Sequence, residues 1–188
     1  KISEVPMQGV SWTTFEMPDT SGKFKEYAKQ AGYHELDIKS CYHKHEIAKV
    51  VDRPAYVFVV TKLARFNTKT NKLYFDDFDL FIKPDSLVTV EENPGTLDDR
   101  VKANFPRSAD KDAGDVSHLV YALLDEIVSD YLTTLDHLGE SINIVEAGVW
   151  NNPSPQMLQK IFTVRRSLIE FRRNAGGMRE VVGALIRD

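Results

Sequence analysis

The feature that most restricts the fold is a repeat of apolar residues in the second half of the chain. Apolar side chains recur at alternating spacings of four and three residues on both sides of a short breaker at residues 151–155. A sustained average of 3.5 residues predicts two long α-helices, and the short connection predicts that they pack as an antiparallel hairpin. The predicted inward positions are Leu124, Val128, Tyr131, Leu135, Leu138, Ile142, Val145 and Val149, followed by Met157, Ile161, Val164, Leu168, Phe171, Ala175, Met178, Val182 and Leu185.

Such a hairpin is long for a chain of 188 residues. Each helix should reach about 45 Å, at about 1.5 Å per residue over roughly 30 residues. We therefore expect part of the hairpin to project and to contact another subunit or another segment of its own chain. A simple core hairpin is the alternative.

The first half of the chain predicts short elements of both kinds. Thr20 or Ser21 can cap a helix that stops at Gly32. Later runs rich in β-branched and aromatic residues, joined by polar turns, predict three strands of an antiparallel meander. The predicted strands cover residues 9–15, 55–66, 73–82 and 87–91, and further predicted helices cover residues 34–44 and 97–105.

These elements place the chain in the α/β (α+β) class, with a mixed, mainly antiparallel sheet flanked by helices and followed by the long helical hairpin. The predicted division is a sheet-and-helix part at residues 1–105, a polar linker at residues 106–114 and the hairpin at residues 115–188.

Composition narrows the class of protein. A formal net charge of -4 argues against a nucleic-acid partner, which a basic excess would favour. The single cysteine, Cys41, excludes an internal disulfide and suits a reducing compartment. No run approaches the roughly 18 apolar residues of a membrane helix. Because the chain begins at Lys1 and ends within a helical pattern, it looks trimmed, and the parent protein can still contain a membrane segment.

A cysteine–histidine segment is the first candidate for metal chemistry. Cys41 and His45 are four residues apart and can share a helical face, with His43 between them and His34 and Glu35 just upstream. The spacing matches no established zinc pattern, and the remaining histidines, His118 and His137, belong to a different helix. We therefore favour solvated polar residues at a helix end over a metal site.

Charged clusters offer weaker candidates. Acidic residues gather at Asp76, Asp77 and Asp79 and at Glu91 and Glu92, but without a calcium-loop pattern they favour an exposed acidic turn. Basic pairs on the last helix could bind phosphates, although interspersed glutamates favour salt-bridged helix faces. These pairs are Arg165 with Arg166 and Arg172 with Arg173.

No catalytic site is predicted. The chain contains no Gly-x-Ser-x-Gly elbow, Walker-type glycine-rich loop or His-Glu-x-x-His motif, and no nucleophile is paired with a base at a recognisable spacing. The sequence does not support an enzyme.

Several local strings, in order, resemble the amino-terminal cytoplasmic domain of the CorA family of magnesium transporters. The resemblance covers nearly the whole chain, from Ser11 to Asp188. It is carried by Trp12, Ala31-Gly32-Tyr33-His34-x-Leu36, Lys49-Val50, Tyr56-Val57-Phe58-Val59-Val60, Leu87-Val88-Thr89-Val90, Leu124-Asp125-x-Ile127-Val128-x-Asp130-Tyr131, Arg166-x-Leu168, Arg172-Arg173 and Met178-Arg179-Glu180-Val181.

The resemblance implies an architecture and a role. In the intact family a stalk helix and two membrane helices follow, and five copies surround one pore, whose Gly-Met-Asn signature lies outside this sequence. The resemblance places this domain on the cytoplasmic side of the cell (inner) membrane. The domain would be joined to the membrane through carboxy-terminal helices that this sequence does not include. Its implied tasks are sensing of intracellular Mg²⁺ and assembly of a homopentamer.

The resemblance also implies one metal ligand. Asp125 matches a family carboxylate that binds a regulatory divalent cation between subunits, where a bridging cation favours a closed state. The family's adjacent acidic pair falls on Lys39-Ser40, and its prolines fall on Glu35 and Ala48. These departures indicate a divergent member with a different transported ion, such as Zn²⁺ or Co²⁺. For Asp125, a helix-surface acid is the alternative.

The sequence supports three hypotheses for the function. The favoured hypothesis is a regulatory domain of a divalent-cation transporter. The second is a soluble coiled-coil interaction module with no transport role. The third is a zinc-dependent enzyme that uses Cys41, His43 and His45.

Overall fold

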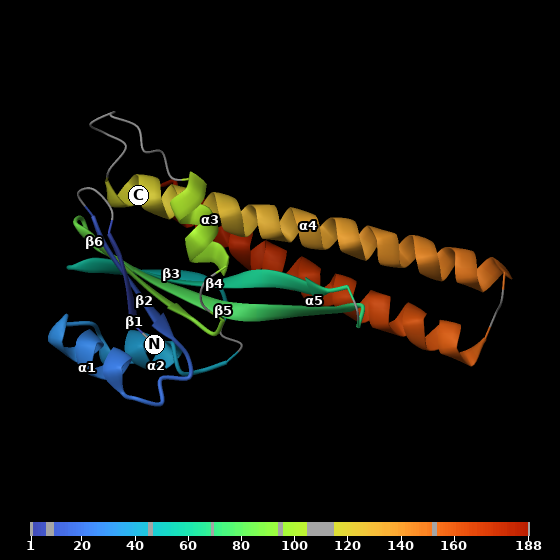
Figure 1. The fold of residues 1–188 in the computed structure, drawn as a ribbon, viewed down its shortest axis with the longest axis horizontal. Helices are drawn as coiled ribbons and strands as arrows, with labels where there is room; N and C mark the ends of the chain where they lie inside the picture. The colour runs from blue at the N-terminus through green and yellow to red at the C-terminus, as the bar shows by residue number, and fades with distance from the viewer. Residues whose placement is uncertain are drawn as a thin grey trace.

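A computed structural model describes residues 2–6, 10–44, 47–68, 70–93, 96–104, 115–151 and 154–187. Figure 1 shows a sheet with short helices on one side and a long helical hairpin on the other. The elements are β1 (Ile2–Pro6), β2 (Ser11–Glu16), α1 (Lys23–Gln30), α2 (Glu35–Ser40), β3 (Lys49–Arg53), β4 (Tyr56–Asn67), β5 (Lys72–Ile82), β6 (Ser86–Glu91), α3 (Thr96–Asn104), α4 (Val116–Asn151) and α5 (Pro155–Leu185).

The strands form one mixed sheet, with the order β1-β2-β6-β5-β4-β3. Neighbouring strands are antiparallel except β2 and β6, which run parallel with Ser11 opposite Ser86. The predicted mixed, mainly antiparallel sheet is therefore confirmed, as is the meander of β4, β5 and β6. The sequence did not predict β1 or β3, the two strands at the sheet edges.

Two apolar clusters cover the opposite faces of the sheet. One strand can contribute to both clusters because successive side chains of a strand point to opposite faces of the sheet. On β5, Phe78 and Leu80 belong to the cluster shared with α3, α4 and α5, whereas Phe81 belongs to the cluster shared with α1 and α2. The molecule therefore has three layers, and the hairpin shares a core with the sheet.

The hairpin prediction is confirmed in outline. The helices α4 and α5 contain 36 and 31 residues, and they lie side by side in opposite directions. Their shared end extends past the turn between β4 and β5, away from the rest of the molecule (Figure 1).

The predicted seam of the hairpin is wrong in part. Tyr131 and Leu138 are buried, but Val128 and Leu135 are exposed. The physical reason is that α4 is covered by the sheet and by α3 as well as by α5, so its buried stripe is rotated from the predicted one. That stripe contains Leu119, Leu123, Ile127, Tyr131, Thr134, Leu138 and Ser141.

Two local predictions in the first half are also corrected. The amino terminus of α1 is satisfied by Asp19 rather than by Thr20 or Ser21, since its carboxylate accepts hydrogen bonds from the backbone N–H groups of residues 23–25. Helix α2 ends at Ser40, short of the predicted residue 44. Tyr42 lies beyond the helix end, and its hydroxyl donates a hydrogen bond to Asp19 Oδ2 over 3.0 Å. The predicted linker at residues 106–114 lies outside the described residues, and the division into two parts stays a prediction.

Candidate functional site

The outer face of α4 carries an exposed apolar ladder with one carboxylate in it. We call Tyr121, Asp125, Val128, Leu132 and Leu135 the outer stripe; all five are exposed, Tyr121 to 70% and Leu132 to 60%. Their spacings of four, three, four and three residues are those of a coiled-coil seam. A ladder of this kind on a free face is typical of a surface that packs against another helix.

An ion-pair network holds the opposite side of α4 against the rest of the fold. Asp130 accepts hydrogen bonds from Arg100 of α3 at 2.6 and 2.8 Å and from Arg65 of β4 at 3.3 Å. Glu126 lies 3.3 Å from the same Arg100. Since Asp130 is roughly 140° from Asp125 around the helix, this network fixes the rotation of α4 that turns Asp125 to the surface.

A divalent cation such as Mg²⁺ or Ca²⁺ needs several oxygen ligands. Within the described part of the chain, no group of three or more histidine, cysteine or acidic side chains is arranged to hold a metal ion. Asp125 can therefore supply one ligand from this chain. That is compatible with Mg²⁺, which keeps several waters and takes one or two carboxylates. Further protein ligands would come from outside the described residues.

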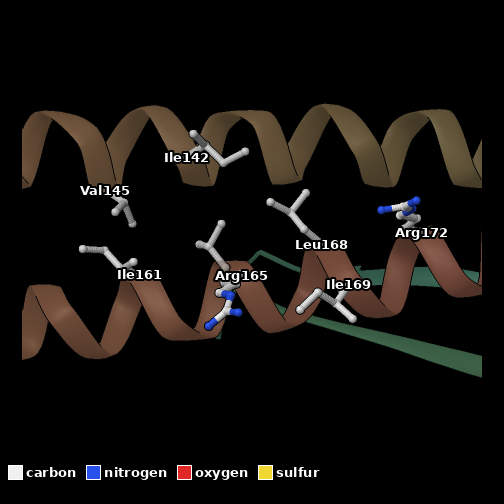
Figure 2. Close-up of a pocket in the computed structure, with 8 residues that line it drawn as sticks. Ile142, Val145, Ile161, Arg165, Leu168, Ile169 and Arg172 are labelled. Carbon is white, nitrogen blue, oxygen red and sulfur yellow. The ribbon is translucent and has the colours of Figure 1, made fainter.

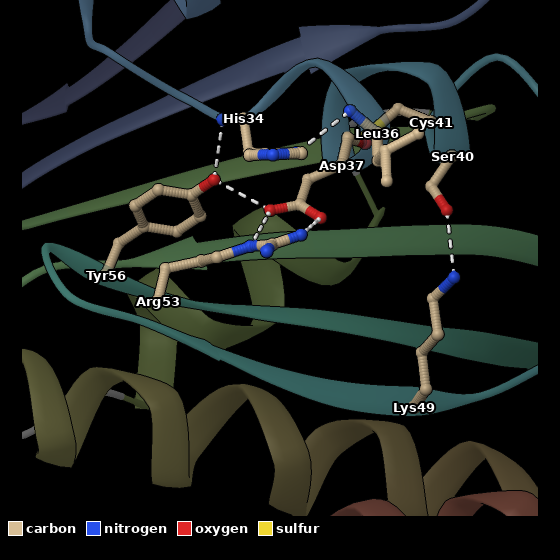
Figure 3. A network of polar contacts seen from close by, with 8 residues as sticks. All are labelled: His34, Leu36, Asp37, Ser40, Cys41, Lys49, Arg53 and Tyr56. Carbon is tan, nitrogen blue, oxygen red and sulfur yellow. Dashed lines mark hydrogen bonds and ion pairs between the residues drawn. The ribbon is translucent and has the colours of Figure 1, made fainter.

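The positions of the lost acidic pair have structural roles of their own. Lys39 forms an ion pair with Glu35 at 2.8 Å, one turn away on α2. Ser40 is buried, and its hydroxyl accepts a hydrogen bond from Lys49 Nζ over 3.0 Å (Figure 3). Neither Lys39 nor Ser40 offers a carboxylate to a cation, so the acidic pair that the family resemblance assigns to these positions is replaced by groups with structural contacts.

A buried carboxylate holds α2 on the sheet. Asp37 accepts hydrogen bonds from Arg53 at 2.6 and 2.8 Å and from the Tyr56 hydroxyl at 2.7 Å, and that hydroxyl accepts from the His34 N–H (Figure 3). Burial alone would raise the pKa of Asp37, but the hydrogen bonds and positive charge of Arg53 outweigh burial and lower it. The network is a structural clamp.

The cysteine–histidine segment is not arranged as a zinc site among the described residues. The Cys41 thiol donates to the Asp37 carbonyl over 3.4 Å. Burial and the nearby charge of Asp79 raise the pKa of Cys41, which disfavours the thiolate that zinc requires. His43 is exposed, and His45 lies outside the described residues.

The acidic cluster on β5 is not the exposed turn that the sequence predicted. Asp76 and Asp79 are buried within the strand, and Glu91 is buried at the end of β6. Neighbouring cations provide the reason, since Asp76 lies 3.7 Å from Arg65 and Asp77 pairs with Lys62. Buried carboxylates of this kind are retained when they are paired.

The salt bridges predicted for the basic pairs on α5 do not form in the part of the chain that the structure describes. Among the described residues, Arg165, Arg166, Arg172 and Arg173 form no ion pair. Arg165 and Arg172 instead line an apolar groove of about 470 Å³ between the distal halves of α4 and α5 (Figure 2). The other residues lining it are Ile142, Val145, Ile161, Val164, Leu168 and Ile169.

The outer stripe is a candidate feature that the sequence does not predict. The predicted inner seam contains Val128 and Leu135 but not Tyr121 or Leu132. The same four–three spacing runs through all of them in the sequence, so a second ladder beside the first could have been found.

Comparisons with known proteins agree on one family. A family model described as "CorA-like Mg2+ transporter protein" matches residues 7–188. The cobalt/magnesium transport protein CorA of Thermotoga maritima is 27% identical over 161 residues, which cover 84% of this chain and 45% of that protein. The chain spans slightly less than half the length of the curated relatives it matches.

Solved structures share the fold. The soluble domain of CorA from Methanocaldococcus jannaschii superposes with a TM-score of 0.76 at 19% identity, covering 92% of this chain and 68% of that one. The cytoplasmic domain of ZntB from Vibrio parahaemolyticus gives a TM-score of 0.73 at 9% identity, covering 99% of this chain and 79% of that one. Among the described helices, none combines the length and apolar character needed to span a bilayer.

Proposed function

Because the chain belongs to the CorA-like Mg²⁺ transporter family, we propose that it is the cytoplasmic part of a divalent-cation transporter, where it assembles subunits and senses intracellular Mg²⁺. The ion pathway would lie outside these residues, in the membrane part of the protein. Transport of Mg²⁺, Co²⁺ or Zn²⁺ is compatible with this proposal. The coiled-coil module without a transport role has no support from the comparisons, and the family is one of transporters rather than enzymes.

The observation that carries the proposal is Asp125 within the apolar outer stripe. When a second copy packs on the stripe, the Asp125 carboxylate loses water, and an unpaired buried charge is costly. A Mg²⁺ ion held by Asp125, by waters and by a ligand of the neighbouring subunit removes that cost. Mg²⁺ occupancy would therefore favour the assembled, closed state, with five copies as the family resemblance implies.

The first prediction tests the metal. Mg²⁺ at ten times its dissociation constant should stabilise the native chain by about 1.4 kcal/mol, because it binds the folded state preferentially. That corresponds to a rise in Tm of about 3–5 °C for a chain of this size. Asp125→Asn should abolish the rise, since a neutral amide is a poor Mg²⁺ ligand. The measurement is thermal unfolding with and without MgCl₂.

The matched control is Glu180→Gln, which neutralises an exposed carboxylate on α5 outside the outer stripe. It should keep the full Mg²⁺ effect. An equal loss in both variants, or an undiminished effect in Asp125→Asn, would exclude Asp125 as the sensor.

The second prediction tests assembly. Leu132→Glu should weaken Mg²⁺-dependent self-association at least tenfold, because it places an unpaired charge in the buried centre of the interface. Tm of the isolated chain should stay unchanged, since Leu132 is exposed there. Sedimentation equilibrium measures the association constant.

The control for this test is Leu36→Glu, a similarly exposed leucine on α2. It should associate as the wild type does. If Leu132→Glu associates normally, the outer stripe is not the assembly surface.

A further inference from the structure

The closed end of the hairpin has almost no charge. Between Ser141 and Val164 the only charged residues are Glu146 and Lys160, which cancel, although 28% of the whole chain is charged. Hairpin ends that project into water are normally polar. Solubility in water therefore does not account for the composition of this end of the hairpin.

Large apolar side chains are exposed at this end. Trp150 is 81% exposed, Ile144 61% and Phe162 53%. Leu158 and Val149 are exposed as well. We call these five residues the apolar tip; they belong to the last turns of α4 and the first turns of α5, the part of the hairpin that extends beyond the sheet (Figure 1).

The apolar tip is spread over more than one side of α4 rather than forming one face. Ile142 and Val145 line the groove (Figure 2), and Val149, four residues after Val145, lies on the same side of α4 by helical spacing. At 100° per residue, Ile144 lies roughly 130° from their mean direction and Trp150 roughly 110° away on the other side. A protein partner or a second copy covers one face of a helix, whereas immersion in an apolar phase covers every side.

We propose that the apolar tip inserts into the interfacial region of a lipid bilayer. Tryptophan is enriched at that depth because its ring is apolar and its N–H is polar. The absence of net charge indicates that insertion depends on apolar burial and not on anionic headgroups. The hairpin thereby rests against the membrane surface without crossing it.

The test uses the 188-residue chain with lipid vesicles and no Mg²⁺. Trp12 is 1% exposed in the core, so the change in tryptophan emission reports Trp150. Phosphatidylcholine vesicles should shift the emission to shorter wavelength, and adding phosphatidylserine or salt should change the partition coefficient less than twofold. Trp150→Ser combined with Phe162→Ser should lower partitioning, measured by co-sedimentation, at least tenfold.

The matched control is Ile186→Ser, which removes an apolar side chain that is 79% exposed at the opposite end of α5. It should partition as the wild type does. Three results would overturn the proposal: equal loss in Ile186→Ser, binding that requires anionic lipid, or a vesicle-free dimer that Trp150→Ser abolishes. Because the vesicle assay contains no Mg²⁺, a negative result in it leaves the Asp125 test unaffected.

Discussion

Replacing Phe81 with alanine is expected to cost about 3–5 kcal/mol of unfolding free energy, the usual range for a fully buried phenylalanine. Phe81 of β5 is 0% exposed and stacks on Tyr33 at 4.2 Å between ring centroids. Its ring also lies 4.6 Å from Phe58 and 6.1 Å from Phe24. The cavity would open between the sheet and the α1/α2 layer, and Tm should fall by about 10 °C.

Tyr74→Ala is the control for this experiment. Tyr74 lies on the same strand but is exposed, so its loss should change Tm only slightly. Chemical denaturation provides the free energies. If Phe81→Ala were no more destabilising than Tyr74→Ala, the aromatic cluster would not be the core of this layer.

Replacing Asp37 with alanine should be the second most damaging change, at about 2–4 kcal/mol. The variant leaves Arg53 and the Tyr56 hydroxyl without their shared acceptor. The expected loss of unfolding free energy lies in the lower part of the range for buried ion pairs, because Arg53 is partly exposed. Glu35→Ala is the matched control, since its ion pair with Lys39 is exposed and should contribute little.

The pH dependence gives an independent check on Asp37. Its pKa is lowered in the folded state, so its contribution is present above its unfolded pKa of about 3.9 and is lost as pH falls through the lower folded value. The difference in unfolding free energy between wild type and Asp37→Ala should therefore be constant at neutral pH and shrink below about pH 4. A difference that stays constant through the acid range would contradict the clamp.

Elements with strong local patterns could be predicted from the sequence. The strands β4, β5 and β6 and the two long helices were all found, because β-branched runs and a 3.5-residue period are local signals. The edge strands β1 and β3 were missed, since each contains only five residues and owes its structure to pairing with a neighbour.

Burial was harder to predict than secondary structure. Asp76 and Asp79 looked like an exposed turn because a sequence does not reveal that Arg65 lies across the strand pair. Val128 and Leu135 looked internal because periodicity marks an apolar face without saying what covers it. For the same reason, Asp125 could be placed on a family position but not on an exposed ladder until α4 was oriented by the sheet.

The parallel pairing of β2 with β6 has a consequence for synthesis of the protein. Ser11 meets Ser86, so β2 cannot complete its place in the sheet until the end of β6, Glu91, has left the ribosome. Contacts this distant in sequence form slowly. The pairing of β4 with β5 and of α4 with α5 is faster, because each joins elements that follow one another in the chain. During that delay Trp12 and Phe15 lack their β6 partners and are accessible to a chaperone that binds apolar segments.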